Sequence, residues 1–155
     1  VADLLAILPV FLILAGPGVP KGQKRDCFTY LLDIYPSLCD LIGVDVPATV
    51  EGKSLVPAMN DPEEIHRETL YLVYGNSIRG VRNRQFKLIE YVVGNDQNTQ
   101  LFDLKNDPWE MTNLAEDPAY ADHLQFLKQE LLRLRDEWDD NSHPTGKVFW
   151  DDYTK

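Results

Sequence analysis

The chain has 155 residues, of which 44% are hydrophobic and 26% charged, and its formal net charge is −10. This length is enough for one domain with a modest core, and the composition is typical of a globular protein. The surplus of acid argues against nucleic acid as a partner, because neutralising phosphates requires an excess of Lys and Arg. It argues equally against binding to an anionic membrane surface.

The first apolar element is the run from Leu4 to Ala15. It is too short for a membrane span, which takes about 20 residues, and no Lys or Arg precedes it as in a signal peptide. Its second part, residues 10–15, predicts a buried parallel strand that is closed by a turn at residues 16–18, Gly-Pro-Gly.

A short helix is expected over residues 33–43, with Asp33 as its N-cap, Pro36 in its first turn and Gly43 as its stop. Its apolar face consists of Leu38, Leu41 and Ile42. Cys39 lies among these residues, which favours a buried free thiol. Two cysteines, Cys27 and Cys39, are too few to define a disulfide framework or a redox compartment.

After a linker at residues 44–61, which is punctuated by Pro and Gly, the sequence becomes β-rich. Strands are expected at residues 69–74, 77–82, 86–93 and 99–103, and their short connections favour an antiparallel meander. A helix is expected from about 118 to 139, capped by Asp117, with one apolar stripe that packs on the sheet rather than forming a coiled coil. The stripe consists of Tyr120, Leu124, Leu127, Leu131, Leu134 and Trp138. The aromatic tail that follows should also dock on protein; it carries Phe149, Trp150 and Tyr153.

Charge is unevenly distributed along this second part. Residues 103–140 contain eleven Asp and Glu against four Lys and Arg, whereas residues 76–91 contain four basic residues against Glu90. The four are Arg79, Arg82, Arg84 and Lys87. The basic stretch is interpreted either as a solvated strand face, which is favoured, or as a surface that a polyanionic substrate approaches. The acidic residues 136–140 are expected to be solvated, since they lie near the negative end of the helix.

Taken alone, the residues predict no active site. The histidines at 66, 123 and 143 lack other His, Cys or carboxylate ligands at the spacing of a metal site. There is no phosphate-binding glycine loop and no Ser in a nucleophile elbow.

The order of several motifs, however, resembles type I sulfatases. Residues 11–22 (FLILAGPGVPKG), 33–43 (DIYPSLCDLIG) and 51–55 (EGKSL) resemble a strand and turn, the following helix and the segment after it. Residues 79–82 (RGVR), 86–89 (FKLI) and 101–111 (LFDLKNDPWEM), with Asn113 and Leu114, resemble the C-terminal subdomain of bacterial sulfatases.

The resemblance implies a fold between α/β and α+β. Residues 1–61 would be the end of an alkaline-phosphatase-like α/β domain, comprising strand, helix and linker. Residues 62–155 would be a C-terminal subdomain, a small antiparallel sheet packed by the helix at about 118–139 and followed by the tail. The parent enzyme would hydrolyse sulfate esters of a small molecule or glycan with a formylglycine and a calcium ion, in the periplasm or outside the cell.

None of that catalytic machinery maps onto this chain. No Cys or Ser begins the formylglycine motif Cys/Ser-X-Pro-X-Arg, and the family's metal carboxylates are expected upstream of Gly16. We therefore expect no catalytic residue, metal or cofactor in this chain, which would be inactive alone and would require the missing N-terminal sulfatase domain. Residues 1–8 depart from the family's pattern, which suggests a truncated or frame-shifted start.

Three residues are candidates for contact with a sulfated substrate, Tyr74, Arg79 and Arg82, since Arg suits the recognition of sulfate or carboxylate. The alternative is that they are ordinary surface residues of strands. Two other functions stay open, a stand-alone binding or interaction module and a fragment of a related phosphatase or phosphodiesterase. The chain expressed alone should be poorly soluble or partly disordered before about Asp61, whereas residues from about Thr69 should fold by themselves.

Overall fold

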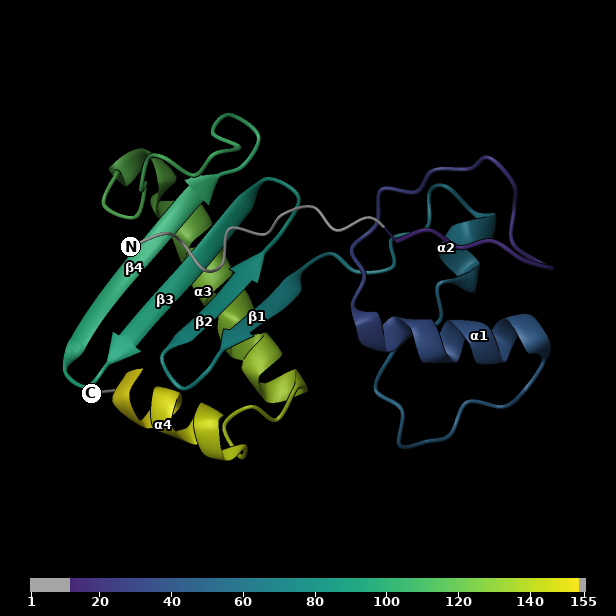
Figure 1. The fold of residues 1–155 in the computed structure, drawn as a ribbon. Coiled ribbons are helices and arrows are strands. Elements are labelled where there is room, and N and C mark those ends of the chain that lie inside the picture. The colour runs from purple at the N-terminus through teal and green to yellow at the C-terminus, as the bar shows by residue number, and fades with distance from the viewer. Residues whose placement is uncertain (1–11, 154–155) are drawn as a thin grey trace. The chain divides into compact units, whose positions relative to one another are not determined.

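The computed structural model describes residues 12–153 (Figure 1). Of these, residues 12–68 belong to one compact unit and residues 69–153 to another. His66 and Arg67 belong to the first unit, where both contact the Asp33 carboxylate. In the described part of the chain, no helix is long and apolar enough to cross a membrane.

The first unit is built from short helices: a 3₁₀ turn η1 (Leu31–Asp33), α1 (Ile34–Ile42) and α2 (Val56–Asn60). Helix α1 ends as predicted at Gly43, whose φ of 71° is the left-handed conformation that favours glycine. The strand predicted at residues 10–15 lies partly outside the described residues, and residues 12–15 form no strand. A parallel strand requires hydrogen-bonding neighbours, and the described residues of this unit contain no other strand.

Helix α1 buries the face opposite to the one predicted. Its buried residues are Pro36, Ser37 and Cys39, and the Cys39 thiol is free and buried as expected. One large apolar side chain of η1 and three of α1 point outward and form a stripe at spacings of four and three: Leu31, Tyr35, Leu38 and Ile42, which are 81%, 52%, 49% and 72% exposed. We call these four residues the outer stripe.

The second unit is a four-stranded antiparallel sheet in the order β1 (Leu70–Tyr74), β2 (Ile78–Arg82), β3 (Phe86–Val93) and β4 (Asp96–Asp103). The predicted meander is therefore confirmed. Strand β4 begins earlier than residue 99, because Val93 pairs with Asp96 and only two residues make the turn. The first of them, Gly94, has a φ of 62°, as tight hairpins with glycine in this position require.

Two helices cover one face of this sheet (Figure 1), α3 (Ala121–Glu137), which follows the 3₁₀ turn η2 (Pro118–Tyr120), and α4 (Pro144–Tyr153). Asp117 caps the start as predicted, accepting a hydrogen bond from the Ala119 N–H at 2.9 Å. The predicted stripe packs on the sheet, with Leu127, Leu131 and Leu134 buried against its apolar residues.

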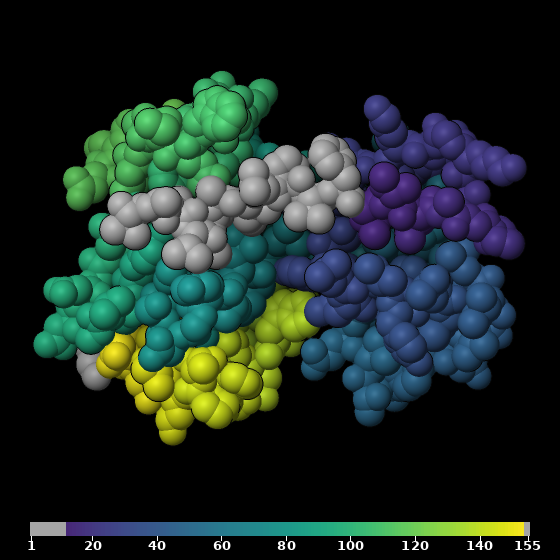
Figure 2. All heavy atoms as spheres, viewed as in Figure 1, coloured from purple at the N-terminus to yellow at the C-terminus, as the bar shows by residue number. Residues whose placement is uncertain are grey.

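The aromatic tail forms α4 and docks on the same core. Phe149 and Trp150 are 0% and 4% exposed, and they pack with the sheet residues and α3. In the space-filling view, the yellow surface of α4 lies directly against the teal strands (Figure 2). The tail therefore completes this unit's own core.

Candidate functional site

The hairpin of β1 and β2 carries the three residues predicted to contact substrate, and it separates them. Tyr74 pairs with Ile78 at one end, whereas Arg82 pairs with Leu70 at the other. The two ends of the hairpin are four residue steps apart along β2, and at a rise of about 3.3 Å per residue this separates them by roughly 13 Å. Because side chains alternate along a strand, Tyr74 and Arg82 share one face of the sheet and Arg79 lies on the other.

Arg79 is fully buried on the face that the helices cover. Its guanidinium forms an ion pair with Asp140, with Nε donating to Oδ2 at 2.6 Å and Nη2 to Oδ1 at 3.2 Å. Its Nη1 donates to the carbonyls of Gly75 and Ile78, each at 2.9 Å. All three nitrogens are thus engaged by the protein, and Arg79 would contact a substrate only if this pair opened. The role of Tyr74 and Arg82 stays a prediction.

Asp140 joins three elements, β1, β2 and α4, through its carboxylate. Besides Arg79, it accepts hydrogen bonds from the Tyr71 hydroxyl at 2.8 Å and from Trp150 Nε1 at 2.7 Å. Burial alone would raise the pKa of Asp140, but the hydrogen bonds from Arg79, Trp150 and Tyr71 and the charge of Arg79 outweigh burial and lower that pKa. Burial, followed by the neighbouring carboxylate, raises the pKa of Tyr71, so that its hydroxyl remains a donor.

This cluster corrects, for Asp140 alone, the expectation that the acidic residues at the end of α3 are solvated, whereas Asp136, Glu137 and Asp139 are exposed as expected. Asp140 is only 9% exposed. The chain turns back after α3 through Asp139, which has a φ of 49°, and this turn aims Asp140 into the core. The sequence held one weak signal of the close packing here, Gly146, where a Cβ would overlap the Asp140 backbone oxygen.

A second buried ion pair lies on the other face of the sheet. Lys87 is 0% exposed, its Nζ pairs with the Glu110 carboxylate, and it lies 5.7 Å from the centre of the Phe102 ring. The basic stretch is therefore wrongly described as a solvated strand face, since Arg79 and Lys87 are both internal. Their counter-charges, Asp140 and Glu110, come from the acidic part of the sequence, so the uneven charge becomes complementary on folding.

Glu90, the acid within the basic stretch, is 2% exposed. It accepts hydrogen bonds from Thr99 Oγ1 at 2.7 Å and from the Tyr153 hydroxyl at 3.3 Å, and Lys128 Nζ lies 3.3 Å away. Burial first, and then the charge of Glu90, raise the pKa of Tyr153. This carboxylate therefore links α3 and α4 to the centre of the sheet.

In the first unit, the equivalent centre is Asp33, which is 0% exposed. Its Oδ1 accepts from the Lys53 N–H at 2.9 Å and from Arg67 Nη2 at 2.5 Å. Its Oδ2 accepts from the Tyr30 N–H at 2.8 Å and lies 3.2 Å from His66 Nε2. Burial alone would raise the pKa of Asp33; the two backbone donors, the charge of Arg67 and the contact with His66 lower it instead.

The Asp33 side chain makes no capping hydrogen bond to α1, contrary to the prediction, because it joins distant segments. His66, for which no role was expected, is one of its partners, and 33 positions separate the two residues. A carboxylate next to a histidine is part of many hydrolytic sites. The neighbouring Ser37 hydroxyl, however, donates to the Asp33 backbone oxygen at 2.6 Å and accepts from the Leu55 N–H at 2.8 Å, so it is not poised as a nucleophile.

A groove of about 380 Å³ lies between residues 115–118 and α3. Its lining is mostly apolar and includes Ala115, Leu124 and Leu132, with Lys128 at its side. No His, Cys or Ser lines it, so the groove offers apolar contact but no nucleophile.

Within residues 12–153, no group of three or more His, Cys, Asp or Glu is arranged to hold a metal ion. The formylglycine motif does not occur in the sequence. What the described residues do provide is two compact units, each with a buried carboxylate that joins distant segments.

Comparisons with known proteins agree with the motif order. Residues 7–137 match the family model described as N-sulphoglucosamine sulphohydrolase, C-terminal. The Delta 4,5-hexuronate-2-O-sulfatase of Bacteroides thetaiotaomicron is 37% identical over 145 residues, which cover 81% of this chain and 29% of that protein. A sulfatase of Formosa agariphila is 32% identical over 139 residues, covering 90% of this chain and 27% of that sulfatase. Human arylsulfatase K is 30% identical over 116 residues, covering 67% of this chain and 22% of arylsulfatase K.

Solved structures of sulfatases and of a related hydrolase also superpose on this chain. BT1596, a 2-O GAG sulfatase, superposes with a TM-score of 0.65 at 32% identity, covering 82% of this chain and 29% of its own. BT4656, solved in complex with its substrate D-glucosamine-2-N,6-O-disulfate, superposes with a TM-score of 0.64 at 28% identity, covering 71% and 24%. The phosphonate monoester hydrolase of Agrobacterium radiobacter superposes with a TM-score of 0.64 at 27% identity, covering 78% and 27%.

The chain thus spans less than a third of the length of each of these relatives. Its antiparallel sheet and covering helices superpose on sulfatases, which confirms the fold class expected for the second unit. Since the family model covers most of the chain, including the motifs of both units, the chain belongs to the family of C-terminal regions of N-sulphoglucosamine sulphohydrolase and corresponds to the C-terminal portion of a type I sulfatase.

Proposed function

We propose that this chain serves as the non-catalytic C-terminal portion of an enzyme that hydrolyses sulfate esters of glycans. The observation that carries the proposal is the family match over residues 7–137. Two relatives are named for sulfated sugars, a hexuronate 2-O-sulfate and a disulfated glucosamine. In this proposal the N-terminal sulfatase domain supplies the formylglycine and the calcium ion, which would provide the nucleophile and stabilise negative charge on the sulfate.

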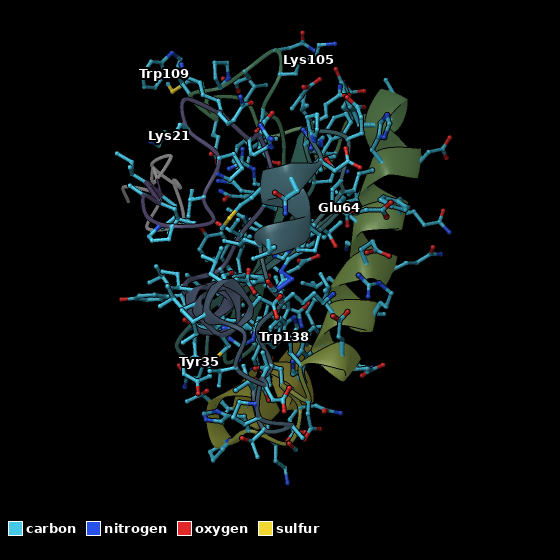
Figure 3. All side chains as sticks on the ribbon, turned by 90° about the vertical axis from the view of Figure 1, so that its right-hand side faces the viewer. Lys21, Tyr35, Glu64, Lys105, Trp109 and Trp138 are labelled. Atoms are coloured by element: carbon cyan, nitrogen blue, oxygen red, sulfur yellow. The ribbon has the colours of Figure 1, made fainter. Side chains whose placement is uncertain are left out.

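The outer stripe of α1 supports the need for that partner domain. Three large apolar side chains on one face of α1, and Leu31 in the preceding turn η1, are about half exposed or more, and such a face is normally buried against another element. Tyr35 of this stripe projects outward from α1 (Figure 3). An N-terminal sulfatase domain is the partner that we propose covers it.

Two side chains of the sheet are proposed to contribute to the wall of the substrate cleft. Tyr74 and Arg82 lie on the face opposite α3, and Tyr74 is 49% exposed. A guanidinium matches the geometry of a sulfate or carboxylate group. Arg79 does not contribute to the wall of the cleft as long as its guanidinium is bound to Asp140.

The test is a hybrid enzyme in which residues 12–153 replace the matched segment of the hexuronate-2-O-sulfatase. A hybrid that is folded by circular dichroism should release sulfate from an unsaturated hexuronate-2-O-sulfate disaccharide, and the 155-residue chain alone should release none. A folded hybrid without turnover would contradict the proposal. In the active hybrid, Arg82→Ala should reduce kcat/KM, with Arg84→Ala as the matched control.

One comparison favours a second candidate function. The phosphonate monoester hydrolase matches this chain as well as several sulfatases do. The same hybrid, assayed with a phosphonate monoester beside the sulfate ester, separates the two. A higher kcat/KM of the hybrid for the phosphonate monoester than for the sulfate ester would indicate that this C-terminal portion belongs to a phosphonate-hydrolysing enzyme.

A further inference from the structure

The loop at residues 104–113, between β4 and the turn that leads to α3, presents two large apolar side chains to solvent. Trp109 is 84% exposed and Met111 is 81% exposed, on either side of Glu110. Trp109 projects from the outer edge of its unit (Figure 3). We call this segment the Trp109 loop.

Hydrogen bonds hold this loop in one shape. Asp103 accepts from the N–H groups of Lys105 and Asn106 at 3.1 and 3.2 Å, and from Asn106 Nδ2 at 2.7 Å. The Thr112 N–H donates to Asp107 Oδ2 at 2.9 Å. The Trp109 side chain is therefore displayed by a rigid support, although the side chain itself makes little contact.

Glu110 fixes the direction in which the two apolar residues point. Its φ of 55° lies in the left-handed region, which is unfavourable for a residue with a side chain. The ion pair with Lys87, whose side chain is 1% exposed, anchors Glu110 to the centre of the sheet. Strain that is maintained by a buried contact is a frequent property of functional segments. Here it turns Trp109 and Met111 outward.

We propose that the Trp109 loop is an anchor of the interface with the N-terminal sulfatase domain, the part of its relatives that this chain does not span. This inference rests on the proposed function. The chain covers 29% or less of the relatives' length, so most of a sulfatase is available as the partner. Trp and Met are enriched in the cores of protein interfaces, and Trp is a frequent hot spot. A loop that is already ordered loses little further conformational entropy on docking.

A sulfated glycan fits the Trp109 loop less well than a protein surface does. The side chains near Trp109 include Asp107 and Glu110, whereas a polyanionic glycan requires basic neighbours. Lys105 is a single exposed cation in the loop, and Met111 offers no strong hydrogen bond to a sugar.

The experiment titrates the 155-residue chain with the portion of the hexuronate-2-O-sulfatase that it does not span, expressed as a separate polypeptide. Of the three tryptophans of this chain, Trp150 is 4% exposed and Trp138 is half-buried, so the difference between titrations of the wild-type chain and of Trp109→Phe reports Trp109 and subtracts the emission of the partner polypeptide. We expect a blue shift that Trp109→Phe abolishes. Trp109→Ser and Met111→Ser should each raise Kd at least tenfold, and the control Lys105→Ala in the same loop less than twofold.

Three outcomes of this titration would contradict the inference. No binding of the wild-type chain would count against both this inference and the proposed function. Binding that neither serine variant weakens would overturn this inference alone and leave the proposed function standing. If Trp109→Ser instead weakens binding of a sulfated disaccharide to the active hybrid and leaves the association of the two polypeptides unchanged, the loop is a glycan contact and the inference is wrong.

Discussion

The Asp140→Asn substitution is the sharpest probe of how the second unit holds together. It preserves the shape of the side chain but removes the charge that faces Arg79, and Arg79 is 0% exposed. Breaking a buried ion pair by removing one partner costs about 3–5 kcal/mol, because the remaining charge is left without compensation. The asparagine oxygen can still accept from Tyr71 or Trp150, so the lost ion pair should account for most of the effect.

The assay is urea unfolding of the 155-residue chain, followed by circular dichroism and by tryptophan fluorescence. A loss of about 3–5 kcal/mol is a large share of the roughly 5–15 kcal/mol that stabilises a domain, so the unfolding midpoint of the second unit should fall sharply. The matched control is Asp136→Asn, which neutralises another carboxylate bound to an arginine, Arg135, at the surface. Equal midpoints for Asp140→Asn and the wild type would refute the assignment of Asp140 as the buried anchor.

Three further predictions concern the second unit. Because the folded pKa of Asp140 is lowered, its contribution to stability is present above its unfolded pKa of about 3.9 and is lost as the pH falls through the lower folded value; unfolding midpoints below pH 4 should therefore depend less on pH in Asp140→Asn than in the wild type. Leu131→Ala should destabilise the second unit by about 2–5 kcal/mol, measured by urea unfolding, and the neighbouring Leu132→Ala, at a side chain that is 37% exposed, by clearly less. Residues 69–155 expressed alone should give a dispersed NMR spectrum and a cooperative thermal transition; a collapsed spectrum would show that the first unit is required for folding.

The elements of the second unit could be read from the sequence because their signals are local. The alternating strands and the spacing of Leu127, Leu131 and Leu134 each lie within one element, and each occurs close to where it was expected. The outer stripe of α1 shows the limit of this reasoning. An apolar face predicts that a helix is buried against another element, but the sequence of the helix does not tell which element that is.

The buried carboxylates could not be predicted in the same way, because their partners are distant in sequence. Asp33 meets Arg67, and Arg79 meets Asp140 across 61 positions. A charge run has the same composition whether its members are solvated or paired inside the fold. Only the fold, through the turn after α3, distinguishes Asp140 from the exposed Asp136.

The Arg-Gly-Val-Arg segment of β2 shows why these distinctions matter for function. Its two arginines are three positions apart, and in a strand with a period of two they must point to opposite faces. Arg79 lies on the face that α3 and α4 cover, where Asp140 compensates its charge. Arg82 lies on the other face together with Tyr74. A motif that looks like one basic patch therefore combines an arginine that is paired inside the fold with one on the opposite face, whose contact with a ligand stays a prediction. Substitution of Arg79 should lower the unfolding midpoint, and substitution of Arg82 should lower kcat/KM of the hybrid enzyme.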